Sequence, residues 1–141
     1  MSNTRTMLAM LALGATVAFA GPAFAEKMKA TLDGKSEVPA NTSAAKGTAD
    51  IDYDAATKKL TWTVTYSGLS GPATAAHFHG PAEPGKNAGV AVAIPNAGTS
   101  PVSGSATLTD AQAADLTAGK YYVNIHTAAN PGGEIRGQVT K

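Results

Sequence analysis

Residues 59–66 restrict the fold of this chain more than any other stretch of the sequence. Every second position is apolar and the positions between are threonines: Leu60, Trp62, Val64 and Tyr66 against Thr61, Thr63 and Thr65. A period of two sends successive side chains to opposite faces of a β-strand, whereas a helix needs apolar residues at spacings of three and four. The run therefore predicts a strand with one buried face.

Shorter runs of the same kind recur along the chain and predict an all-β domain. We expect strands at residues 27–32, 47–53, 59–66, 75–80, 90–94, 104–108, 120–127 and 134–140, separated by segments rich in Gly, Pro and Asn. One short helix is expected at about residues 110–118, because Thr109 and Gln112 have the spacing of a capping box and Gly119 suits a helix end. About eight short strands with one helix favour a Greek-key β-sandwich or barrel.

The first residues have the pattern of a secretory signal peptide. Arg5 precedes an apolar run at residues 7–20, and Ala23-Phe24-Ala25 supplies a small-x-small cleavage sequence. The run is shorter than the roughly 20 residues that span a membrane. We therefore expect residues 1–25 to be a cleaved signal peptide and residues 26–141 to be one exported domain. Its expected location is periplasmic or secreted, with no membrane insertion after cleavage.

Charge and cysteine content exclude several classes of partner and site. The chain has 11 Lys and Arg against 10 Asp and Glu, and loss of Arg5 with the leader balances them. A neutral domain without a basic cluster has no electrostatic reason to bind nucleic acid. The absence of cysteine excludes disulfides and thiolate metal sites.

The three histidines of the chain fall in two of the expected strands. His77 and His79 flank Phe78, and His126 follows Ile125. If Phe78 and Ile125 fill the core, strand alternation turns all three imidazoles to the opposite, outward face.

Three imidazoles on one face predict a site for a single metal ion. An H-x-H pair presents two ring nitrogens side by side, and a third histidine closes a trigonal face with one position left open. Imidazole suits copper, zinc, nickel and iron. Alternation in the run at residues 134–140 also turns Glu134 outward. Glu134 is therefore a candidate fourth ligand or hydrogen-bond acceptor for a ring N–H. The alternative reading is that histidines on an exposed β face have no function.

Three segments of the chain resemble the CHRD (chordin) domain family. They are His77-Phe78-His79-Gly80-Pro81-Ala82, Leu116-x-x-Gly119-x-Tyr121-Tyr122-Val123-Asn124-Ile125-His126-Thr127 and Asn130-Pro131-Gly132-Gly133-Glu134-Ile135-Arg136-Gly137-Gln138. The resemblance spans nearly all of residues 26–141. The family is named for repeats in chordin, an extracellular binder of growth factors, and also occurs as single exported bacterial domains. The resemblance implies an exported domain whose partner is another exported protein.

A second resemblance is to the Cu,Zn superoxide dismutase family, a Greek-key β-barrel with histidine-bound copper. The His77-Phe78-His79 segment is similar to its H-x-H copper pair, and His126 to its late copper histidine. The segment before Arg136 is similar to the stretch that leads to its active-site arginine, which implies that Arg136 steers a small anion. A bridging histidine, the zinc ligands and the disulfide cysteines of that family are missing. The resemblance thus implies a single copper ion, with zinc or iron less favoured.

Three functions remain open from the sequence. The leading one is an exported metal-binding β domain, copper preferred, for metal binding, delivery or protection, and this reading favours a protein that is not an enzyme. The second is a metal-independent protein-interaction or structural module. The third is a copper-dependent, superoxide dismutase-like oxidoreductase that uses Arg136.

Overall fold

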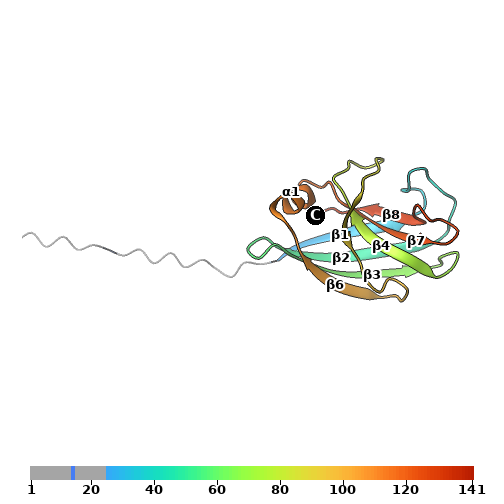
Figure 1. Ribbon diagram of the computed structural model, residues 1–141, viewed down its shortest axis with the longest axis horizontal. Coiled ribbons are helices and arrows are strands. Elements are labelled where there is room, and N and C mark those ends of the chain that lie inside the picture. The colour runs from blue at the N-terminus through green and yellow to red at the C-terminus, as the bar shows by residue number, and fades with distance from the viewer. Residues whose placement is uncertain (1–13, 15–24) are drawn as a thin grey trace, which may run out of the picture.

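The computed structural model describes Gly14 and residues 25–141 (Figure 1). The expected signal peptide at residues 1–25 lies almost wholly outside the described residues and stays a prediction. Within the described part of the chain, no helix is long and apolar enough to cross a membrane.

The described residues form one antiparallel sheet and one helix. The elements are β1 (Glu26–Asp33), β2 (Lys46–Asp54), β3 (Lys59–Ser67), β4 (Ala73–His79), β5 (Val90–Ala93), β6 (Val102–Thr107), α1 (Asp110–Thr117), β7 (Tyr122–Thr127) and β8 (Ile135–Gln138). The strand order is β5-β4-β7-β8-β1-β2-β3-β6, and the sheet curls into a nearly closed barrel (Figure 1). This confirms the all-β, Greek-key prediction, in which three connections cross between the two halves of the sheet: β3 to β4, β5 to β6, and β6 through α1 to β7.

The strand predicted from strict alternation is confirmed as β3, in which Leu60, Trp62 and Val64 are buried and Tyr66 is partly buried. Trp62 on β3 packs edge-on against Phe78 on β4, with ring centroids 5.3 Å apart, although the two strands are not neighbours in the sheet. This contact crosses the interior, so it joins the two halves of the barrel. Full burial of such a ring stabilises the fold by about 1.5–3 kcal/mol.

The last two strands are shorter than the sequence suggested, since both begin later and β8 also ends earlier. The run predicted at residues 120–127 pairs only as Tyr122–Thr127, and the run predicted at 134–140 only as Ile135–Gln138. Beyond β8, Thr140 forms an isolated bridge to Lys29. The residues just before β7 and just after β8 meet neighbouring segments instead of continuing these strands. Alternation alone does not reveal such contacts.

The helix closes one end of the barrel, beside the β2–β3 turn (Figure 1). Its capping box is confirmed: Gln112 N donates to Thr109 Oγ1, and Thr109 N donates to Gln112 Oε1. The helix buries Leu116 in the core, and the side-chain amide of Gln112 donates to the Ala91 carbonyl of edge strand β5. Lys58 in the β2–β3 turn pairs with Asp110.

The outward face of β4, β7 and β8 is covered, whereas the sequence predicted an exposed face. Two loops, at residues 34–45 and 80–89, rise on this side of the barrel (Figure 1). They meet where the Asn87 side chain donates to the Val38 carbonyl. Under them lie side chains that alternation turned outward but that are nonetheless buried: His79, Tyr122, Asn124 and Arg136. The prediction of exposure was wrong because the alternation pattern carries no information about loops that fold back over a strand.

Replacing Trp62 with alanine should remove about 3–5 kcal/mol of folding free energy, because it leaves a cavity between β3 and β4. The measurement is urea denaturation. The matched control is Thr61→Ala on the exposed face of the same strand, which should stay within about 0.5 kcal/mol of wild type. Equal losses in the two variants would contradict the assignment of the buried face.

Candidate metal centre

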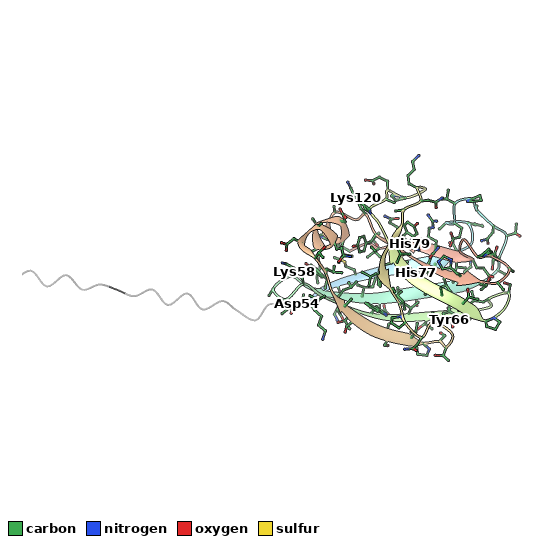
Figure 2. All side chains as sticks on the ribbon, in the orientation of Figure 1. Asp54, Lys58, Tyr66, His77, His79 and Lys120 are labelled. Atoms are coloured by element: carbon green, nitrogen blue, oxygen red, sulfur yellow. The ribbon has the colours of Figure 1, made fainter. Side chains whose placement is uncertain are left out.

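The pairing of β4 with β7 brings the three histidines to one face of the sheet. His77 lies opposite Asn124, His79 lies opposite Tyr122, and His126 lies opposite Ala75. His126 is therefore the diagonal neighbour of His77, a position within reach of side chains of this length. Figure 2 shows His77 and His79 close together on β4, far from the β2–β3 turn marked by Asp54 and Lys58.

The histidine rings converge closely enough to share one ion. Nδ1 of His77 lies 3.0 Å from Nε2 of His126. Ring centroids are 4.9 Å apart for His77 and His126, 5.3 Å for His77 and His79, and 6.0 Å for His79 and His126. One nitrogen from each ring lies within 4.8 Å of the other two. The structure thus brings together the three residues that the sequence singled out.

Main-chain carbonyls orient two of the rings. Nδ1 of His126 lies 2.8 Å from the Pro131 carbonyl, which can only accept, so Nδ1 carries the proton and Nε2 keeps its lone pair. His79 has Nδ1 at 3.0 Å from the Ala88 carbonyl and Nε2 at 2.9 Å from Asn124 Oδ1. A neutral imidazole donates only once, so one nitrogen of His79 presents a lone pair to an oxygen.

The surroundings of His77 and His79 favour the neutral imidazole, which is the form that binds metals. Burial lowers the pKa of His77, and the neighbouring charges of His126 and His79 lower it further. Burial also lowers the pKa of His79 and outweighs the hydrogen bonds to Ala88 and Asn124, which raise it. At neutral pH a cation has few protons to displace from these two residues.

Glu134 lies away from the histidine cluster. Its carboxylate is fully buried and accepts hydrogen bonds from Ser43 Oγ at 2.9 Å, Thr127 Oγ1 at 2.8 Å, Asn130 Nδ2 at 3.1 Å and the Ser70 hydroxyl. Burial alone would raise its pKa, but hydrogen bonds from Ser70, Thr127 and Ser43 prevail and hold the pKa at about 2. The carboxylate joins three loops, and the structure gives it no contact with a histidine ring.

Arg136 is also directed away from any opening. Its Nε donates to Glu37 Oε2 at 3.2 Å, Nη1 to the Lys86 carbonyl at 3.1 Å and Nη2 to Asn87 Oδ1 at 2.6 Å. The guanidinium carbon lies 3.9 Å from the centre of the Tyr122 ring. With 5% of its surface exposed, Arg136 already has a partner for each of its three nitrogens.

Sequence reasoning missed three residues around the histidines. Alternation places Asn124 and Tyr122 on the same outward side of the strand as His126. This shared side was the feature of the sequence that could have identified both residues. Glu37 lies in an irregular loop and becomes a partner of Arg136 only through tertiary folding. No local pattern could have identified it.

Comparison with known proteins assigns the class of this domain. Residues 28–139 match the model of the CHRD domain, so the chain belongs to the CHRD domain family. The match covers every strand that contributes to the histidine face. No curated protein and no solved structure matches the chain.

Replacing Glu134 with glutamine should destabilise the fold by about 2 kcal/mol near neutral pH, because hydrogen bonds to a charged acceptor are lost. The folded-state pKa of about 2 lies below the ordinary 4.5, so the folded protein binds fewer protons than the unfolded chain between these values. The contribution of Glu134 is therefore complete above about pH 4.5 and declines as the pH falls towards 2.

Chemical denaturation across this pH range tests the prediction. In Glu134→Gln the dependence of stability on pH should become shallower, whereas Glu83→Gln in the exposed part of the 80–89 loop should leave it unchanged. Parallel curves for wild type and Glu134→Gln would show that the carboxylate is not held in its charged form.

Proposed function

We propose that this CHRD domain binds one metal ion, copper by preference, on the face formed by β4 and β7. The observation that carries the proposal is the convergence of one nitrogen from each of His77, His79 and His126 within 4.8 Å. Two nitrogens that each bind an ion at ~2.0 Å with tetrahedral geometry lie ~3.3 Å apart. The 3.0 Å between His77 and His126 fits that spacing.

The donor set supports the same proposal. His126 Nε2, His77 Nδ1 and His79 Nε2 would hold the ion, and burial favours the neutral form of His77 and His79. A cation at His79 would also remove the unfavourable approach of a ring lone pair to an oxygen. Three imidazoles without a thiolate favour Cu(II) over Zn(II), Ni(II) and Fe(II) in intrinsic affinity. Copper in such a site supplies a Lewis acid and a one-electron couple.

Binding, delivery or protection is a better match to the surroundings than catalysis. A dismutase-like reaction needs a cation that draws the anionic substrate to the metal. Arg136 is buried and its three nitrogens are occupied by Glu37 and the 80–89 loop. The proposal places the domain outside the cytoplasm, in the periplasm or secreted, on the strength of the leader pattern at residues 1–25.

One observation favours the metal-independent alternative. Strand β5 is an edge of the sheet, and Val90 at its start is 57% exposed. An edge strand with an exposed apolar residue can pair with a strand of a partner protein. In that reading the domain recognises another exported protein through β5, and the histidines have no ligand.

Copper titration of the purified, untagged protein decides between these two functions. The wild type should bind one equivalent of Cu(II), with an electron paramagnetic resonance spectrum of nitrogen ligands. His126→Ala and His77→Ala should lose more than the roughly 10–100-fold in affinity that follows loss of an outer-shell partner. Glu83→Gln, a change in an exposed carboxylate, should bind as the wild type does. Equal binding by wild type and His126→Ala would remove the site.

We expect the copper-loaded protein to consume superoxide no faster than the same concentration of free copper ion. The reason is that the Arg136 guanidinium is buried and each of its three nitrogens already donates to a protein acceptor. A stopped-flow assay of superoxide decay measures this. Turnover well above free copper, lost in Arg136→Met, would restore the oxidoreductase reading.

A further inference from the structure

His79 is the most firmly held of the three histidines. The ring of Tyr122 stacks on it with an interplanar angle of 5° and a centroid separation of 4.9 Å. Its two nitrogens meet the Ala88 carbonyl and Asn124 Oδ1 at 3.0 and 2.9 Å. One face and both nitrogens of the imidazole therefore have a defined neighbour, and 7% of the residue is exposed.

The Tyr122 and Ala88 contacts both lead to Arg136. Strand β7 lies between β4 and β8, so the Arg136 guanidinium and His79 contact Tyr122 from its two sides. Arg136 also binds the loop just before Ala88, through the Lys86 carbonyl and the Asn87 side chain. The Ala88 main chain in turn exchanges hydrogen bonds of 3.1 Å with the Tyr122 hydroxyl.

The Asn124 side chain lies near Glu37, the ion-pair partner of Arg136, without a hydrogen bond between them. Asn124 Nδ2 and Glu37 Oε1 both lie beside Gly133, where a Cβ atom would overlap each, and Glu37 Oε1 has no hydrogen-bond partner among the described residues. Gly133 has a φ of 126°, so glycine suits the position on two counts. The Asn124 amide also donates to the Gly132 carbonyl. Because the Asn124 NH₂ donates to Gly132, its oxygen is turned to His79.

An ion pair this deeply buried needs an explanation other than stability. The side chains of Arg136 and Glu37 are 6% and 3% exposed. Removing two such charges from water costs about as much as their attraction returns, and apolar replacements of similar volume are often neutral or stabilising. What an apolar pair cannot supply is the directed contact of Arg136 to Tyr122 and to Lys86 and Asn87.

We propose that the Arg136–Glu37 pair positions the His79 imidazole. Arg136 sets the ring plane through Tyr122 and the Ala88 carbonyl, and Glu37 acts through Arg136, whose guanidinium it holds by the Nε hydrogen bond. Both are positioning residues, since neither contacts the ring or an ion. The effect on the ring belongs to the apoprotein, whereas the effect on metal affinity rests on the metal-binding function proposed above.

The test replaces the pair with apolar side chains, in the double variant Arg136→Met/Glu37→Leu. Long-range ¹H–¹⁵N spectra of the metal-free wild type should show His79 in one dominant tautomer with a slowly exchanging ring N–H. In the double variant the ring should sample both tautomers, and its N–H should exchange about tenfold faster or more, because the ring opens locally. His126, held by Pro131, is the internal reference. Copper affinity should fall by about 10–100-fold.

A second variant covers the case in which the double variant fails to fold. Asn87 is exposed, so Asn87→Ala should fold normally while it frees Arg136 Nη2 and loosens the 86–88 segment. It should change His79 in the same direction by a smaller amount. Glu134→Gln is the matched control, because it alters a buried carboxylate near β8 that contacts none of the partners of His79.

The outcomes separate the two proposals. An unchanged His79 tautomer and exchange rate in Asn87→Ala and in the folded double variant would overturn the positioning role. Copper affinity that falls without any change at His79 would overturn it as well. A His79 ring that loosens as expected, in a protein that binds no copper even as wild type, would uphold the positioning role and remove the metal-binding function.

Discussion

Phe78 packs against Trp62 inside the barrel, and the direction of His77 and His79 depends on this contact. Side chains on a strand alternate, so a phenylalanine turned inward turns both flanking histidines to the other face. The same constraint acts on β7, where Val123 and Ile125 fill the core and leave Asn124 and His126 opposite. Antiparallel pairing of β4 with β7 then places the two outward sets side by side. The histidine cluster is thus a consequence of core packing and strand register.

The outward face differs from an ordinary solvent face because two loops cover it. Their backbone polar groups need partners once buried, and side chains of the sheet supply them. Arg136 and Tyr122 hold the 80–89 loop, and Arg136 also pairs with Glu37 of the 34–45 loop. Glu134 does the same at the other end of the face with Ser43, Ser70 and Asn130. Two buried acidic groups, Glu37 and Glu134, therefore serve this covered face, and neither is a ligand candidate beside the three histidines.

The commitment of the buried charged side chains to the loops bears on the function proposed for this member of the CHRD domain family. A catalytic copper site needs an approach for substrate and a charge to attract it. Here the one arginine near the cluster is committed to an ion pair and to main-chain carbonyls. The His77 and His126 pair remains half-buried, and its nitrogens face each other at 3.0 Å. Those features suit retention of an ion, which agrees with binding, delivery or protection.

The sequence by itself determined the strands, the capped helix and the shared phase of the three histidines, because each depends on the periodicity of neighbouring residues. The family resemblance, confirmed over residues 28–139, rests on the same local segments. Tertiary structure alone decided that the outward face is buried, that Glu134 holds loops, and that Arg136 pairs with Glu37 from far along the chain. Alternation states which side of a strand a residue occupies. It cannot state what lies on that side, because the covering loops have no period and reach the sheet through contacts distant in sequence.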